Sequence, residues 1–427
     1  MKKGYPRILL ILVNLVVIAS ILVLATACSS GSSNSAKAGK ELKVGIITPS
    51  TGKLSYKGTP GEHGFLDAVS YINNELGGVE GYKIKPLWFD SAYESNNVTT
   101  AVESLKDQGA LFFVTMSSTE MSYGQTIANR AGFPGMAVFT TPANYRPPAH
   151  IYGQMPDYGD DWIAFTNYYL KNVWKGTGKP KMALHLLNNV TGYGVRDAAR
   201  AKAESMGVEV IWPPEEHTAT DMSMMDSMTR IKAQNPDVLF ISSTDQPTYL
   251  ILKAAKDLGM TPKMTVGLAH ATYSKALVDM AGASLLEGVY VACPWVTWDD
   301  KAAGLAKVKE YVKKNNPKDE GDGNYLSLWA AGLVTSEMLK NAVKNAGYDV
   351  LAKGDANAWK AMETQGIQTL KNYDVQGLQG PATYREGDNR LAISLKMYVV
   401  KGGQLSAVSD WVDAPVTKYE DFSWWGK

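Results

Sequence analysis

The sequence has few residues that would cross-link the chain or bind a metal. Among 427 residues there are two cysteines, Cys28 and Cys293, and five histidines. No Cys-x-x-Cys, His-x-x-His or His-Glu-x-x-His spacing occurs, so neither a disulfide framework nor a zinc site is indicated. Cys293 lies in the apolar run 288–298 and is expected to be a small buried hydrophobic residue. We expect no metal and no other cofactor.

An excess of charge of one sign is also absent. Lys and Arg total 43 and Asp and Glu total 42. A balanced chain creates no field that would attract nucleic acid, so we expect no such partner. The sequence also lacks a Gly-x-Gly-x-x-Gly motif after a strand, a phosphate-binding Gly-Lys-Ser/Thr motif and a recognisable catalytic constellation. These absences favour a binding protein over an enzyme.

The N-terminal residues have the pattern of an export signal. Three basic residues and no acid precede the apolar run 8–24, and small residues at 25–27 precede Cys28. This arrangement is similar to a bacterial lipobox, with Ala25 where leucine is commoner. We therefore expect residues 1–27 to be a lipoprotein signal peptide and Cys28 to carry the lipid, which would anchor the protein to the cell membrane outside the cytoplasm.

Two further features bear on this N-terminal region. The apolar run 8–24 approaches the roughly 17 to 25 residues of a membrane-spanning helix, which is the alternative interpretation. Residues 28–40 are mainly Ser, Gly, Asn, Ala and Lys and are too polar to bury a core. They are expected to form a flexible tether.

The remainder of the chain alternates short apolar runs with longer helical patterns. Strands are predicted at 43–48 and 82–90, and helices at 61–76 and 96–108. This alternation is typical of a parallel sheet covered by helices, and the length is sufficient for two domains. The fold class predicted from these patterns is α/β.

One unit of sequence occurs twice. Residues 111–120 and 238–245 each form an apolar strand that ends in Ser-Ser-Thr and an acid, followed by a helical pattern, a glycine and another strand. Two similar lobes are therefore predicted. Parallel sheets bind ligands beyond the carboxyl ends of their strands. The hydroxyl groups at these ends either cap the next helix or contact a ligand, and the helix start itself favours a polar or negatively charged group.

Five segments of the chain follow one another in an informative order. They are KVGIITPSTG (43–52), GGVEGYKIKPL (77–87), SST (117–119), GFP (132–134) and GYG (192–194). Together they resemble type I periplasmic binding proteins of the branched-chain amino acid transporter group, which includes leucine/isoleucine/valine-binding proteins. The resemblance implies two Rossmann-like lobes joined by a three-crossing hinge, with the ligand between them.

The resemblance also implies limits for the lobes and a set of binding residues. The first lobe would comprise 41–157 and 297–375, the second 158–296 and 376–412, with 413–427 as a C-terminal extension. Ligand contacts would fall on residues after strands and on two tyrosines. These residues are Ser117, Ser118, Phe139, Thr141, Tyr56 and Tyr193.

The second lobe departs from the family pattern. Where aliphatic amino-acid binders have an acid for the ammonium group, this chain has Val-Gly-Leu-Ala-His-Ala at 266–271. His270 either bonds an uncharged or anionic ligand or is a core histidine. Thr244 and Asp245, at the end of the second repeat, either contact the ligand or cap the helix. The 11 Trp and 22 Tyr residues favour an aromatic pocket.

The predicted function is that of a monomeric, lipid-anchored solute-binding component of an ABC importer. Its ligand would be a small carboxylate or amide with an apolar or aromatic body rather than a free aliphatic amino acid. The lobes would close on this ligand and present it to a membrane permease. Two alternatives are a ligand-sensing receptor that reports to a signalling partner and a secreted α/β enzyme.

Overall fold

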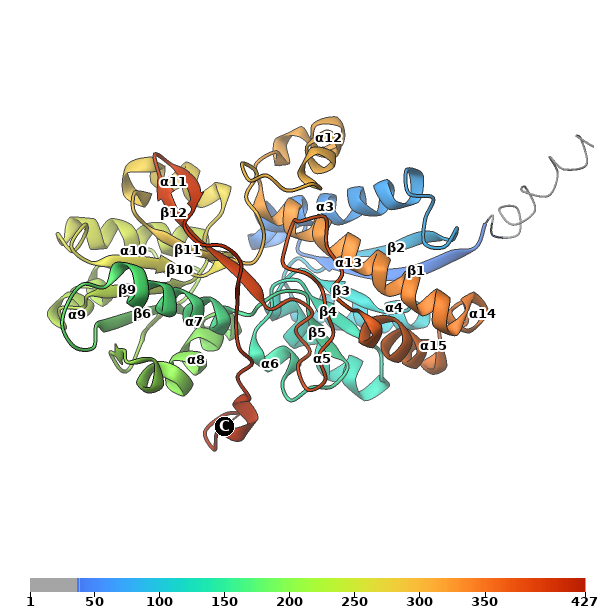
Figure 1. Ribbon diagram of the computed structural model, residues 1–427, viewed down its shortest axis with the longest axis horizontal. Coiled ribbons are helices and arrows are strands. Elements are labelled where there is room, and N and C mark those ends of the chain that lie inside the picture. Colours follow the sequence, from blue (N-terminus) through green and yellow to red (C-terminus); the bar gives the residue numbers. More distant parts are fainter. Residues whose placement is uncertain (1–36, 38, 427) are drawn as a thin grey trace, which may run out of the picture.

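The structure is a computed structural model that describes residue 37 and residues 39–426. The predicted signal peptide, Cys28 and most of the predicted tether lie outside these residues. Within the described part of the chain, no helix is both long and apolar enough to cross a membrane. Two α/β lobes lie side by side in Figure 1, each built on its own sheet.

The first sheet is entirely parallel and has the strand order β2-β1-β3-β4-β5. Its strands are β1 (Glu41–Thr48), β2 (Lys83–Asp90), β3 (Phe113–Thr115), β4 (Gly135–Ala137) and β5 (Ile151–Gly153). The helices between the first four strands are α3 (Ser55–Asn74), α4 (Ser95–Asp107) and α5 (Ser118–Ala131). The order reverses between β1 and β3, which makes the space beyond these two strands a switch point.

The second sheet repeats this order as β7-β6-β9-β10-β11. Its strands are β6 (Lys181–Leu187), β7 (Glu209–Val210), β9 (Val238–Ser242), β10 (Thr265–Leu268) and β11 (Tyr290–Cys293), with β8 (Glu215–His217) also paired to β6. Antiparallel strands β12 (Ser394–Lys401), β13 (Gln404–Ala407) and β14 (Val412–Asp413) extend it. The lobe's helices are α7 (Tyr158–Tyr168), α8 (Val190–Met206), α9 (Met225–Ala233), α10 (Asp245–Asp257) and α11 (Lys275–Leu286). The second switch point lies between β6 and β9.

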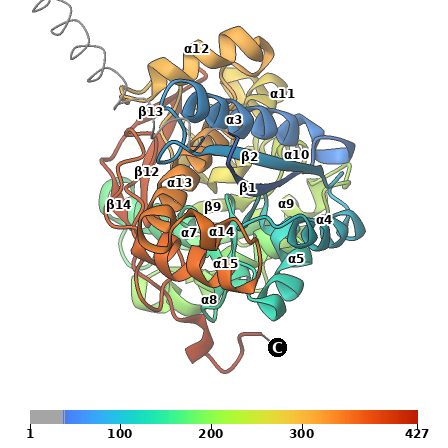
Figure 2. The ribbon, with the colours of Figure 1, turned by 90° about the vertical axis from the view of Figure 1, so that its right-hand side faces the viewer.

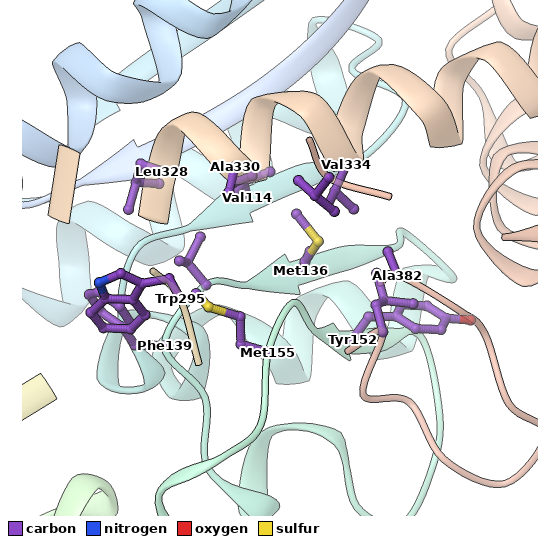
Figure 3. Packing of buried hydrophobic residues seen from close by; sticks show 14 of the residues in the cluster. Val114, Met136, Phe139, Tyr152, Met155, Trp295, Leu328, Ala330, Val334 and Ala382 are labelled. Carbon is purple, nitrogen blue, oxygen red and sulfur yellow. The ribbon is translucent and has the colours of Figure 1, made fainter. Parts of the chain in front are cut away.

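Later helices complete the first lobe. These are α12 (Leu305–Asn315), α13 (Gly323–Ala346), α14 (Tyr348–Leu351) and α15 (Ala356–Ala361). Helix α13 packs along α3, and β1 and β2 lie between this pair and α4 with α5 (Figure 2). Val334 and Leu328 of α13 lie over Val114 and Met136 of the sheet (Figure 3). The two-lobed α/β fold with three chain crossings is thus confirmed, whereas the exact lobe limits remain a prediction.

Helix α3 begins six residues before its predicted start at residue 61. Its first turns contain Gly58, Pro60 and Gly61, which are read as loop residues in a sequence pattern. The glycines are required by packing: a Cβ at Gly58 would lie 2.0 Å from the Pro49 carbonyl oxygen. In the same helix, a Cβ at Gly64 would lie 2.1 Å from the Tyr325 carbonyl oxygen. Close approach of two backbones therefore explains residues that look like helix breakers.

The two copies of the repeated unit occupy equivalent places, because β3 and β9 are each next to the first strand of their sheet. Their helix starts differ in detail. Ser117 caps α5 and forms a capping box with Glu120, whereas the side chain of Thr244 makes no capping hydrogen bond to α10. Cys293 is 4% exposed, which confirms that it is buried.

Candidate functional site

A large cavity opens where the carboxyl ends of the two sheets face each other. Its volume is about 830 Å³, toward the upper end of the roughly 300 to 1,000 Å³ found for small-molecule pockets. Both lobes contribute residues that follow the strands on either side of the switch points. These include Leu54, Tyr56, Tyr93 and Thr119 from the first lobe and Asn188, Asn189, Thr244 and Asp245 from the second. The cavity therefore occupies the position in which open α/β sheets bind ligands.

The start of α5 supplies the buried polar groups on the first-lobe side. The Ser117 hydroxyl accepts a hydrogen bond from the Glu120 backbone N–H at 3.2 Å, and the Ser117 backbone N–H donates to the Glu120 carboxylate at 2.9 Å. Burial raises the pKa of Glu120 to about 7, although bonds from Ser91 and Ser117 oppose the rise. The hydroxyls of Ser118 and Thr119 are buried without a hydrogen-bond partner. Thr119 also lines the cavity, so its buried hydroxyl lies close to the space that a ligand would occupy.

Direct contacts join the lobes beside the cavity. The Tyr56 hydroxyl donates to the Asp245 carboxylate at 2.7 Å, and the Lys57 ammonium lies 2.9 Å from the same oxygen. Lys57 also donates to the Ala271 carbonyl at 2.8 Å, and the Ser274 hydroxyl donates to the second oxygen of Asp245. Burial, followed by the Asp245 charge, raises the pKa of Tyr56. We call Tyr56, Lys57 and Asp245 the interlobe latch.

His270 belongs to a buried aromatic cluster rather than to the wall of the large cavity. Its ring lies 4.9 Å from that of Tyr158, 5.6 Å from Phe139 and 5.4 Å from Trp295. Its Nδ1 lies 2.7 Å from the Asp161 carboxylate, which also accepts the His270 backbone N–H at 3.0 Å. Burial raises the pKa of Asp161, and His270 opposes that rise. His270, which lies where the aliphatic amino-acid binders have an acid, therefore already has an acidic partner within the protein.

A second cavity of about 360 Å³ lies between the lobes. It is lined by His270, Cys293, Trp295 and Trp298 together with residues of the β12–β13 turn and of the segment before α13. It lies away from both switch points, and its lining follows β10 and β11 rather than the strands that flank a switch point. We therefore place the candidate binding site in the larger one.

The predicted site residues are thus distributed over several places. Tyr56, Thr244 and Asp245 line the larger cavity. Thr141 is buried at the start of α6 (Pro142–Tyr145), and the Tyr193 hydroxyl donates to Asn188 of the cavity wall. As ligand contacts all nine remain predictions. Those outside the lining of the larger cavity are Ser117, Ser118, Phe139, Thr141, Tyr193 and His270.

Most of the cavity wall consists of residues that were not among the predicted ligand contacts. Tyr93 follows β2, Asn188 and Asn189 follow β6, and Thr218 and Thr220 follow β8. A search of every strand's carboxyl end would have found them. Met222 and Met280, which complete the apolar side, lie in a loop and within a helix and carry no comparable signal.

Two equivalent lobes with a cavity at their facing switch points define a two-lobed ligand-binding protein. A family model described as periplasmic binding protein matches residues 41–404. The chain belongs to the periplasmic binding protein family.

Curated relatives support this assignment. An amino acid binding protein of Pseudomonas aeruginosa is 24% identical over 367 residues, which cover 83% of this chain and 92% of that protein. The Leu/Ile/Val-binding protein BraC3 of Rhizobium johnstonii is 23% identical over 373 residues, 86% of this chain and 94% of its own. These relatives are named as binding proteins and not as enzymes.

Solved structures show the same fold. A branched chain amino acid ABC transporter protein from Thermus thermophilus with bound valine has a TM-score of 0.75 at 18% identity, covering 90% of this chain and 98% of its own. A fatty acid ABC transporter substrate-binding protein from Thermomonospora curvata has a TM-score of 0.73 at 18% identity, covering 90% of this chain and 94% of its own. Proteins described with different solutes therefore share this architecture.

Proposed function

We propose that this protein is the lipid-anchored, non-catalytic solute receptor of an ABC importer and that its lobes close on a small metabolite held in the larger cavity. The observation that carries the proposal is the position of that cavity, at the switch points of both sheets at once. Polar groups from both lobes face the same space, so one ligand could contact both. Such a ligand would stabilise the closed arrangement by its additional contacts.

The interlobe latch supports closure as the output of binding. Lys57 is 8% exposed and Asp245 is 1% exposed, so their ion pair exists only where the lobes meet. Separation of the lobes would break this ion pair, but it would also return both charges to water, and the hydration they regain partly offsets the lost attraction. Because these two terms oppose each other, the contacts of a bound ligand could decide which form is favoured.

The importer and anchor roles rest on the relatives and on the N-terminal sequence. Solved structures with this fold are described as parts of ABC transporters, and the same partner is proposed here. Cys28 after an apolar run is the proposed lipid acceptor, which mass spectrometry of the mature N-terminal peptide would test. An anchored receptor would be held at high local concentration near its permease.

Small-angle scattering tests ligand-driven closure. The compound that co-purifies with the full chain under native conditions is identified by mass spectrometry, removed and then added back. We expect the radius of gyration to fall on its addition, because hinge closure brings the two lobes together. An unchanged radius at saturating ligand would contradict hinge closure, and a compound that is recovered chemically altered would indicate an enzyme instead.

A further inference from the structure

The buried charge of the larger cavity is already paired within the protein. Among the described residues that line it, Lys53, Asp245 and Asp279 are charged. Asp245 is neutralised by Lys57 of the interlobe latch, and Asp279 pairs with Lys275 at 2.6 Å on the exposed side. Lys53 is exposed, and its ammonium lies 5.3 Å from the centre of the Tyr93 ring. No buried charge is left to balance a charge on the ligand.

The helix starts at the cavity are balanced in the same way. The N-terminus of a helix carries a partial positive charge that would attract an anion. The first turn of α5 already contains Glu120 and that of α10 contains Asp245, both buried. The third helix, α8, is capped by the neutral side chain of Asn189, whose oxygen accepts the Thr191 N–H at 2.9 Å. A ligand carboxylate would therefore compete with an internal acidic side chain at two of these three helix starts.

The groups that remain are neutral hydrogen-bonding groups and large apolar surfaces. Thr119 is 6% exposed and its buried hydroxyl has no partner, and Asn188 and Thr220 lie on the opposite wall. Tyr93, Tyr123 and Met280 supply flat or flexible apolar surface. Tyrosine rings bind planar or apolar bodies, and thioethers adapt to their shape.

We propose that the solute is an electrically neutral molecule, with amide or hydroxyl groups on an aromatic or apolar body, rather than a zwitterionic amino acid. A charged ligand would have to leave water for a site with no free buried counter-charge, which is costly. A neutral ligand avoids this cost and can still form hydrogen bonds with the neutral polar groups of the cavity wall. The proposal rests on the proposed function, since it concerns the same cavity.

A series of four phenylalanine derivatives tests it, because they share one side chain and differ in charge. These are phenylalanine, N-acetylphenylalanine, phenylalaninamide and N-acetylphenylalaninamide. In calorimetric titrations at pH 7 we expect the neutral N-acetylphenylalaninamide to bind the full chain at least tenfold more tightly than each charged member. Equal or tighter binding of phenylalanine would overturn the proposal.

Two variants make the test specific to charge. Lys57→Met leaves Asp245 without its cation, so affinity for the cationic phenylalaninamide should rise at least tenfold. Asp245→Asn leaves Lys57 unpaired, so affinity for the anionic N-acetylphenylalanine should rise instead. Both variants break the same interlobe contact, so a merely structural effect would change all four affinities in the same direction in both, which would contradict the proposal. The matched control is Lys253→Met, which breaks an exposed ion pair on the same helix α10.

The co-purified compound separates failure of this inference from failure of the proposed function. A recovered compound that is neutral at pH 7 supports the inference even if the four derivatives are too small to bind. A recovered carboxylate, amine or zwitterion overturns it and leaves the solute-binding role intact. A chain that carries no compound and binds none of the derivatives contradicts both.

Discussion

Replacing Arg390 with methionine should lower the free energy of unfolding by about 3 to 5 kcal/mol. Arg390 is 1% exposed and precedes β12, in the segment that returns to the second lobe. Its guanidinium donates to Asp160 at 2.6 Å and, through two nitrogens, to Asp388 at 2.9 Å. Burial raises the pKa of Asp160, and Arg390 opposes that rise. Without the cation, two buried carboxylates would have no counter-charge.

The chain contains a matched control for this prediction. Arg230 makes a similar two-nitrogen contact with Glu215, at 2.8 and 2.6 Å, but its side chain is 62% exposed. Arg230→Met should therefore cost about 0 to 1 kcal/mol. Urea unfolding followed by circular dichroism measures both variants. If Arg390→Met lowered the free energy of unfolding by less than 1 kcal/mol, the buried ion pairs of Arg390 would not be important for stability.

Acid should destabilise the second lobe through a buried pair of histidines. His185 and His217 face each other with their Nδ1 atoms 2.9 Å apart, so one must donate and the other accept. Their Nε2 atoms bond Ser227 and Ser243 at 2.8 and 2.6 Å. A proton added to the accepting Nδ1 would place two donors against each other and a charge in the core. Burial accordingly lowers the pKa of His185, and lowers that of His217 from 6.5 to about 4.

The lowered pKa values of the two histidines determine how the free energy of unfolding changes with pH. Between pH 6.5 and about 4 the unfolded chain binds more protons than the folded one, so the free energy of unfolding falls as the pH falls. For His217 alone the loss across this range is about 3 kcal/mol. Glu120, whose pKa is raised to about 7, acts in the opposite direction. The histidine effect must therefore be measured as a difference between variants.

The double variant His185→Gln/His217→Gln provides this difference. Glutamine keeps donor and acceptor groups but does not titrate, so the free energy of unfolding of the variant should depend less steeply on pH between 6.5 and 4. Urea unfolding at several pH values measures both slopes. Parallel slopes for the wild-type chain and the double variant would show that the histidine pair is not the source of acid sensitivity.

The arrangement of the two lobes could be predicted from the sequence because it depends on local patterns. Apolar strands such as 43–48 and the repeated Ser-Ser-Thr turns identified the sheets and the strand ends. The predicted start of α3 was wrong because Gly58 serves a close approach of two backbones that no local pattern reveals. The spacing of apolar residues indicates which face of a helix is buried. The close approach of two backbones depends also on a partner segment far along the chain.

The same limit explains the partial success at the site. Thr244 and Asp245 were found because they follow a strand, but the role of Asp245 depends on Tyr56, which lies 189 residues away. His270 was recognised as a departure, but its acidic partner Asp161 and the aromatic rings around it come from other elements. Pairing across the lobes decides which charges are free, and only the folded structure shows it.

The central claim is that the cavity at the facing switch points holds the solute, and calorimetric titration of the co-purified compound into Thr119→Val tests it most directly. This substitution removes the unpartnered hydroxyl on the cavity wall, so affinity should fall about tenfold, which corresponds to about 1.4 kcal/mol. Thr335→Val, which removes an equally buried and unpartnered hydroxyl from α13 outside the cavity lining, should bind like the wild-type chain. Unchanged affinity in Thr119→Val, or an equal loss in both variants, would contradict the account.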